Sequence, residues 1–250
     1  MNRLVITMGD PCGVGPEIIV KFFDGIYKVE DKRLFLVVVG SKSVLEYYKK
    51  KLRIDLEIVE ITKAHIVDGK LENGKLHLIN IDTDIDKLEF GKHTELGGAL
   101  SIKYLDKAIE LCHGKYVDGI VTCPISKDSI NMAGFKYSGH TEYLAEKSKT
   151  EDFAMVLKGK KVVVLLNSTH VSLKEAINRV TKESVLNKIR LAQKAKKELG
   201  LTGSIAVAGL NPHNGENGLF GTEEIEIIAP AVEEAQKEGI DCEGPIVPDS

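Results

Sequence analysis

The sequence predicts an α/β protein with two domains, each built on mainly parallel strands with flanking helices. Short apolar runs rich in β-branched residues alternate with amphipathic stretches that repeat at helical spacing, which is the pattern of strand–helix–strand units. Several of the runs are apolar at every position, as expected of strands that are buried on both faces. A length of 250 residues, 43% of them hydrophobic, is enough for two such domains.

The predicted strands and helices are spread along the whole chain. Eight apolar runs are predicted strands, at residues 4–8, 34–40, 56–61, 76–81, 117–123, 153–157, 162–167 and 204–209. Three long amphipathic patterns predict helices, at residues 43–52, 97–114 and 185–200. The last pattern is closed by Gly200, the residue type that most often follows a helix end.

Two features of the middle of the chain refine this prediction. The sequence KGKK between the runs 153–157 and 162–167 predicts a hairpin, and therefore one antiparallel strand pair. Because residues 162–166 are apolar throughout, we expect them to be buried on both faces. The domain boundary is predicted near residue 130, which gives a first domain of residues 1–130 and a second domain of residues 131–250.

The stretch TMGDPCGVGPEI, residues 7–18, lies between the first strand and a helix start, where nucleotide-binding loops are found. Gly13 and Gly15 supply two glycines of the dinucleotide pattern G-x-G-x-x-G, but the third position is Ile18. A phosphate-binding P-loop is excluded as well, because the fifth residue after the first glycine is Val14 and no Gly-Lys-Ser/Thr follows. This loop therefore serves something other than the two commonest nucleotide sites.

Composition and charge exclude several functional classes. A net charge of −3 with interspersed signs predicts neither a nucleic-acid partner nor a membrane surface. The N-terminus has no targeting pattern and no segment reaches the length of a membrane span, so a cytoplasmic protein is expected. The four cysteines are far apart and form no C-x-x-C pair, which favours buried, reduced thiols over disulfides or zinc: Cys12, Cys112, Cys123 and Cys242.

Polar side chains follow four of the predicted strands or open the next helix, and these are the candidate site residues. Ligands collect at the carboxyl ends of strands in open α/β sheets, so residues at these positions carry the most information about function. The candidates are His170 in LLNSTH, His213 in GLNPHNGENG, His140 with Thr141 in GHTEYLA, and Lys127 in VTCPISK. In LLNSTHVSLKE, Ser172 and the acid three residues later predict a capping box at the next helix.

Each candidate has a functional and a structural interpretation. His170 and His213 stand at equivalent strand ends, and neutral imidazoles are the commonest ligands of catalytic metal ions, which need about three protein groups. His140 and Thr141 open a helix whose free amides favour an anionic group, so we assign them to substrate. Lys127 is a candidate for proton transfer or anion binding. Solvated or hydrogen-bonded structural residues are the alternative in every case.

Two acids are further candidate site residues, whereas the remaining histidines are not. Asp10 is, with Lys127, a candidate catalytic residue, and both Asp10 and Glu216 are candidates for contacts to substrate or to a residue that binds metal, with helix capping and loop structure as the alternative. Four histidines lie in segments without polar companions and are expected to be ordinary surface or core residues: His65, His77, His93 and His113. Zinc suits nitrogen ligands, but magnesium, manganese and cobalt stay open for a mixed site.

The motifs together resemble one known family across the whole chain, the 4-hydroxythreonine-4-phosphate dehydrogenases of pyridoxal phosphate biosynthesis. The resemblance rests on TMGDPCGVGPEI, DGIVTCPISK, GHTEYLA, LLNSTH and GLNPHNGENGLFGTEE, in the family's order and approximate spacing. It implies a fold like that of isocitrate and isopropylmalate dehydrogenases, and a homodimer with active sites at the interface. It also implies metal binding by His170 and His213 and substrate binding by His140 and Thr141.

The family resemblance also implies a reaction. The substrate, 4-hydroxythreonine 4-phosphate, has a hydroxyl on the carbon β to its carboxylate, so hydride transfer to NAD or NADP gives a β-keto acid. That acid loses carbon dioxide to give 3-amino-2-oxopropyl phosphate, and a divalent ion assists both steps. Two alternatives stay open: a dehydrogenase of 4-phospho-threonate or 4-phospho-erythronate, and a non-catalytic binding homologue. An acyl-phosphate transferase of related fold is a weaker third.

The resemblance further implies a C-terminal continuation that carries a third metal-binding histidine and much of the cofactor site. The printed sequence ends at Ser250, before that region. We therefore expect the 250-residue form to bind metal weakly and to turn over little substrate.

Overall fold

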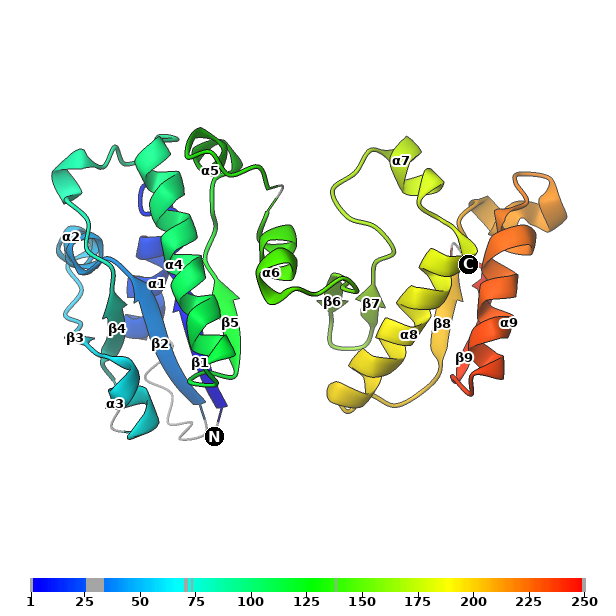
Figure 1. Cartoon of the computed structure of the whole chain (residues 1–250), viewed down its shortest axis with the longest axis horizontal. Coiled ribbons are helices and arrows are strands. Elements are labelled where there is room, and N and C mark those ends of the chain that lie inside the picture. The colour runs from blue at the N-terminus through cyan, green and yellow to red at the C-terminus, as the bar shows by residue number, and fades with distance from the viewer. Residues whose placement is uncertain (1, 26–33, 70–71, 73, 138, 249–250) are drawn as a thin grey trace. The chain divides into compact units, whose positions relative to one another are not determined.

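In the computed structural model the chain divides into two compact units. The structure describes residues 2–25, 34–69, 72, 74–137 and 139–248. Unit 1 comprises Met1–Ser148 and unit 2 comprises Lys149–Ser250. Figure 1 shows the helices and strands of both.

Unit 1 is built on a parallel five-stranded sheet in the order β3-β4-β2-β1-β5. Its strands are β1 (Asn2–Thr7), β2 (Leu34–Gly40), β3 (Ile58–Glu60), β4 (Leu76–Asn80) and β5 (Gly119–Thr122). Its helices are α1 (Gly15–Gly25), α2 (Lys42–Leu52), α3 (Lys63–Val67), the short 3₁₀ turn η1 (Ile85–Lys87), α4 (Glu95–His113), α5 (Lys127–Met132) and α6 (His140–Ser148). The predicted α/β class and mainly parallel sheet are therefore confirmed.

The core of unit 1 lies where the helices pack on this sheet. Residues 37–39 of β2 are fully buried, as expected of a central strand that is apolar at every position. Helix α4 lies across β1, β2 and β5 (Figure 1) and buries Tyr104, Ala108 and Leu111 against them. Thr94 caps the N-terminus of α4, because its hydroxyl accepts a hydrogen bond from the amide of Gly97 at 3.0 Å.

Over its described residues, 149–248, unit 2 contains two separate strand pairs and three α-helices. The antiparallel pair is β6 (Val156–Lys158) with β7 (Val163–Leu165), and the parallel pair is β8 (Ile205–Ala208) with β9 (Cys242–Ile246). The helices are α7 (Leu173–Asn178), α8 (Lys182–Glu198) and α9 (Ala229–Lys237), with the turn η2 (Pro212–Gly218) and the π-helical segment η3 (Glu224–Ile228) before α9. A small core joins α8, α9 and β9 through residues such as Leu186, Ile189, Val232 and Cys242.

The β6–β7 pair confirms the predicted hairpin but corrects its expected burial. Val162 is 64% exposed, Leu157 55% and Val164 44%, although we expected residues 162–166 to be covered on both faces. Among the strands that the structure describes, β7 pairs with β6 alone, so no larger sheet carries it into a core. The apolar run at residues 162–166 therefore predicted a strand correctly. The burial of its side chains depends instead on which strands pack around it, and the run does not reveal that.

The predicted domain boundary also differs from the division in the structure. The units divide at Ser148, so α6, which the sequence prediction put in the second domain, belongs to unit 1. Tyr143 of α6 is almost fully buried in a cluster with Leu105 of α4 and Ile130 of α5. Its hydroxyl donates a hydrogen bond to Asp106 of α4 at 2.5 Å. This packing ties α5 and α6 to the first sheet.

Two exclusions drawn from the sequence concern membrane spans and disulfides. Within the residues described, no helix combines the length and apolarity that crossing a bilayer requires. All four cysteines are free thiols, three of them buried and Cys112 partly exposed. Burial raises the pKa of Cys123 to about 11, so this thiol stays protonated at neutral pH.

The glycines in the loop between β1 and α1 serve close backbone packing. Gly9 has a φ of +72°, and a Cβ there would lie 2.2 Å from the carbonyl oxygen of Pro124. A Cβ at Gly15 would lie 2.0 Å from the carbonyl oxygen of Met8. This account explains why the loop is rich in glycine without the spacing of a dinucleotide site.

This packing gives a stability prediction with a matched control in the same helix. Gly15→Ala forces a methyl group against a backbone oxygen, and overpacking of this kind costs roughly 1–3 kcal/mol. Gly25→Ala, at the other end of α1, meets no atom within 4 Å among the residues that the structure describes and is expected to leave stability unchanged or slightly higher. Urea unfolding of both variants tests this, and equal midpoints would contradict the packing account.

Candidate active site

The loops after β1 and β5 meet at the carboxyl edge of the unit 1 sheet, because these strands are parallel neighbours. The backbone amide of Asp10 donates to the carbonyl of Pro124 at 3.0 Å. The Asp10 carboxylate is 4% exposed and accepts hydrogen bonds from the amide of Cys12 at 2.9 Å and the hydroxyl of Ser129 at 3.0 Å. These bonds are the ones expected if Asp10 has a structural role. Its carboxylate joins the loop after β1 to α5, the helix that follows β5.

Lys127 is the first residue of α5 and is exposed at this edge. It follows Ser126, whose hydroxyl caps α5 by accepting from the amide of Ser129 at 3.1 Å. Ser126 also lies 2.7 Å from Nδ1 of His93, and Nε2 of His93 lies 3.8 Å from Asp128. His93, expected to lack polar companions, therefore belongs to this edge. In the sequence, the feature that could have indicated this is the position of His93 directly before Thr94, the residue that caps α4.

His140 and Thr141 open α6 at its N-terminus, as the sequence predicts. Burial lowers the pKa of His140, so its imidazole is neutral at pH 7. Its Nε2 atom is shielded from solvent and has no hydrogen-bond partner among the residues described. An unpaired buried nitrogen costs free energy, and a bound polar group would recover it. His140 is thus suited to a ligand that offers a hydrogen bond.

His170 lies in the loop between β7 and α7 in unit 2. Its φ is +55°, a left-handed conformation that is uncommon for residues other than glycine, and its side chain is exposed. Ser172 caps α7 by accepting from the amide of Glu175 at 3.2 Å, which confirms the predicted helix start but supplies only the Ser172 half of the predicted capping box. The Glu175 carboxylate accepts a hydrogen bond from Arg179 at 2.8 Å.

His213 lies in a turn of unusual backbone geometry after β8. Five consecutive residues, 213–217, have left-handed dihedral angles, from φ 52° and ψ 31° at His213 to φ 54° and ψ 33° at Asn217. For a residue with a side chain this conformation costs roughly 1–2 kcal/mol. The remaining predicted residue of this turn, Glu216, is exposed. Strained backbone of this kind persists where the surrounding structure enforces it, and it gathers at functional sites.

The base of this turn rests on a buried acid that the sequence analysis did not select. Glu224 is 2% exposed and accepts hydrogen bonds from the amides of Leu210 at 2.7 Å and Asn211 at 2.6 Å. Burial acts to raise the pKa of Glu224, but the hydrogen bonds from Asn211 and Leu210 outweigh it and lower the pKa below its usual value. The carboxylate is therefore ionised at neutral pH.

The two candidate metal ligands are both in unit 2, but the strands before them belong to different sheets. β7 lies in the antiparallel hairpin and β8 pairs with β9, so the two strand ends that we took as equivalent lie in different sheets. The part of the chain that the structure describes contains no group of three His, Cys, Asp or Glu residues placed to hold a metal. His170 and His213, both on left-handed backbone, can supply two of the about three protein ligands that a catalytic ion needs.

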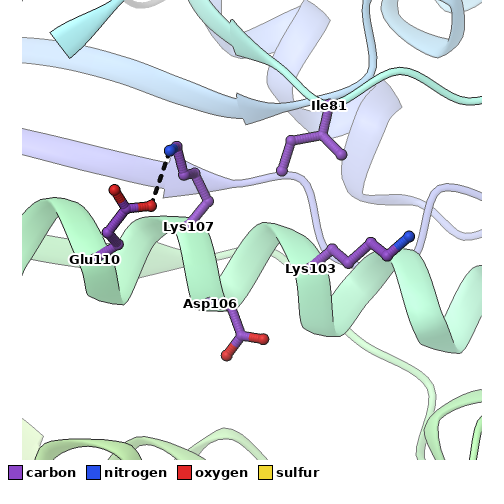
Figure 2. Close-up of a pocket in the computed structure, with 5 residues that line it drawn as sticks. All are labelled: Ile81, Lys103, Asp106, Lys107 and Glu110. Atoms are coloured by element: carbon purple, nitrogen blue, oxygen red, sulfur yellow. Dashed lines mark hydrogen bonds and ion pairs between the residues drawn. The ribbon is translucent and has the colours of Figure 1, made fainter.

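A shallow hollow in unit 1, of about 290 Å³, does not coincide with any candidate residue. Figure 2 shows its lining, in which Lys107 and Glu110 of α4 form an ion pair at 2.8 Å. The other lining residues are Ile81, Lys103 and Asp106. Its charged groups are largely engaged with one another or with Tyr143, so it adds nothing to the site.

Comparison with known proteins places this chain and its fold within an α/β enzyme family. Residues 32–250 match the profile of the family described as pyridoxal phosphate biosynthetic protein PdxA. The chain belongs to the PdxA family.

Relatives within the family carry two names. A protein of Fusobacterium nucleatum, provisionally named D-threonate 4-phosphate dehydrogenase, is 43% identical over all of this chain and 74% of its own length. The 4-hydroxythreonine-4-phosphate dehydrogenase of a Sulfurihydrogenibium species is 40% identical over all of this chain and 76% of its own length. The crystal structure of 4-hydroxythreonine-4-phosphate dehydrogenase from Klebsiella pneumoniae superposes with a TM-score of 0.89 at 33% identity, covering 99% of this chain and 74% of that one.

Proposed function

We propose that this chain is an NAD- or NADP-dependent dehydrogenase of 4-hydroxythreonine 4-phosphate that works in the cytoplasm. Hydride leaves the carbon that bears the 3-hydroxyl, and the resulting β-keto acid loses carbon dioxide to give 3-amino-2-oxopropyl phosphate for pyridoxal 5′-phosphate biosynthesis. One observation carries the proposal: this chain, over its whole length, is 40% identical to a relative named 4-hydroxythreonine-4-phosphate dehydrogenase.

The residues of unit 1 are proposed to bind and orient the phosphorylated substrate. The neutral imidazole of His140 and the hydroxyl of Thr141 stand at the N-terminus of α6, where free amides attract an anion. Lys127 offers a cation at the first turn of α5, for anion binding or proton transfer. Asp10 is proposed to act through the loops that it joins, since its carboxylate is buried and occupied.

The residues of unit 2 are proposed to hold a divalent cation, with zinc, magnesium, manganese and cobalt all compatible with the chemistry. His170 and His213 would each supply one imidazole nitrogen. When bound, such an ion supplies Lewis acidity at the carbonyl that hydride removal creates. The nicotinamide cofactor is the hydride acceptor.

D-threonate 4-phosphate is a second candidate substrate, because the Fusobacterium relative with that name is 43% identical to this chain. The two substrates share the carboxylate, the 3-hydroxyl and the phosphate, and they differ at carbon 2, where threonate has a hydroxyl in place of the amino group. A site that hydrogen-bonds one of these groups rejects the other by leaving a buried polar atom unpaired.

Turnover of the two phosphates in parallel tests the function. We expect NAD- or NADP-dependent oxidation of 4-hydroxythreonine 4-phosphate with a kcat/KM at least about 10-fold above that for D-threonate 4-phosphate. Because the chain matches about three quarters of its relatives' length, the assay includes a chimaera that adds the part of the Fusobacterium relative outside the match. The reverse preference would select the second candidate, and no oxidation of either phosphate by either protein would contradict both.

Single substitutions separate substrate binding from metal binding. His140→Asn is expected to raise KM or lower kcat about 10-fold or more with unchanged metal content, because it removes one imidazole from the substrate site. His170→Ala and His213→Ala are each expected to lower metal affinity, because each removes one ligand. Metal analysis after dialysis and steady-state kinetics measure these effects. His65→Ala, at an exposed histidine of unit 1, is the control. Loss of metal from His140→Asn would reassign His140.

We also propose that the protein forms a homodimer, as the family resemblance implies. The apolar side chains of the β6–β7 hairpin support this proposal, since Leu157, Val162 and Val164 are 44–64% exposed. Exposed apolar side chains grouped on one element are typical of interaction surfaces.

A charge on this hairpin tests the dimer. Val162→Lys places an ammonium group in the apolar surface and is expected to shift a dimer toward monomer in sedimentation velocity, because burying an unpaired charge is costly. Val67→Lys is the control, since Val67 is 63% exposed at the end of α3 in unit 1. A monomeric wild type, or a dimer that Val162→Lys leaves intact at all concentrations, would contradict the proposal.

A further inference from the structure

The left-handed turn at residues 213–217 requires support from its neighbours, because His, Asn and Gly adopt this conformation more readily than other residues but do so singly rather than in a run of five. Only one of the five residues is a glycine, so the other four adopt a disfavoured conformation. Such a segment returns to ordinary angles unless neighbouring groups hold it. The holding groups should therefore be visible at its entry and beneath it.

The entry to the turn is held by Glu224. Its Oε1 atom accepts the backbone amides of Leu210 and Asn211 at 2.7 and 2.6 Å, and its Oε2 atom accepts from the side-chain amide of Asn211 at 2.9 Å. The same Asn211 amide nitrogen donates to Glu223 at 2.7 Å. Three donors converge on one buried carboxylate, and an amide in its place cannot accept all three.

The middle of the turn rests on the same carboxylate. A Cβ at Gly215 would lie 2.8 Å from Oε2 of Glu224, so glycine is required where the turn crosses the acid. The amide of Asn214 donates to the carbonyl of Asn211 at 3.1 Å, and its side chain donates to the carbonyl of Pro245 in β9 at 3.2 Å. A continuous set of contacts therefore runs from Glu224 through Asn211 to the residue beside His213.

Glu224 reaches this position from a rigid element. It opens the π-helical segment η3, which continues directly into α9, and α9 is packed into the unit 2 core through Ala231 and Val232. Wide π-helical turns inside helices are frequent at functional sites. The carboxylate therefore has a fixed position relative to the core, and the hydrogen bonds that it accepts hold the turn at that position.

We propose that Glu224 is a positioning residue for His213: its buried carboxylate fixes the left-handed turn and thereby the direction of the His213 imidazole. The inference rests on the proposed function, in which His213 is a metal ligand, and it assigns the support of that ligand to a residue that is not itself proposed to bind the metal. Groups behind a metal ligand typically change metal affinity by about 10- to 100-fold when they are lost.

Nuclear magnetic resonance of the metal-free protein tests the positioning directly. In Glu224→Gln, the imidazole nitrogen signals of His213 and the amide signals of residues 213–217 are expected to shift or broaden, while the signals of unit 1 stay unchanged. Glu226→Gln is the matched control, because Glu226 is exposed in the same segment. Unchanged His213 signals in a folded Glu224→Gln protein would overturn the proposal.

A double-mutant cycle on cobalt affinity adds a second readout. Glu224→Gln is expected to weaken Co²⁺ binding about 10- to 100-fold, and it should add no further loss in a His213→Ala background, because both changes then act through the same ligand. Independent, additive losses would overturn the proposal. A wild type that binds no Co²⁺ would refute the metal role of His213 in the proposed function, and the resonance signals alone then decide on Glu224.

Asn211→Ala provides the test if Glu224→Gln does not fold. This variant removes the side-chain bonds to Glu223 and Glu224 and leaves the two backbone bonds to Glu224 in place. A smaller shift of the His213 signals, in a protein with wild-type circular dichroism, supports the proposal. Signals identical to those of the wild type overturn it.

Discussion

The parallel pairing of β1 with β2 on one side and β5 on the other is the constraint on which unit 1 depends. Because both neighbours run in the same direction, the loops that leave β1 and β5 emerge at one edge and can bond to each other. The Asp10 carboxylate completes this arrangement by bonding within its own loop and to Ser129 of α5. The substrate residues proposed in unit 1 lie on helices that this sheet and α4 hold in place.

Most of the fold could be predicted because strand and helix signals are local. The alternation of apolar runs and amphipathic patterns located all five strands of unit 1, and the KGKK turn located the hairpin. Burial is a property of the whole fold, however, so the apolar run at Val162 suggested a core that the hairpin does not have. The domain division depended on the long-range packing of Tyr143, which no local pattern reveals.

Candidate site residues could be predicted from the sequence where they also mark the start of a helix. His140 and Lys127 stand at helix starts, and polar residues that open helices are recognisable in sequence. Glu224 was not recognisable, because a charged residue in a segment rich in acids predicts a solvated surface. Its burial arises only when the loop after β8 folds back over it and supplies three donors. A buried acid of this kind can be recognised only in the folded structure.

The two units hold their candidate residues in different ways, and the difference follows from chemistry. An anionic substrate group is attracted by the free amides of a helix N-terminus, so regular structure suffices for His140 and Thr141. A metal ligand must instead present one nitrogen along one direction, and both His170 and His213 have left-handed backbone that ordinary helices and strands do not offer. Holding such a backbone requires buried bonds like those of Glu224. On this argument, the hydrogen bonds that Glu224 accepts at the entry of the turn offset the cost of the strain at His213.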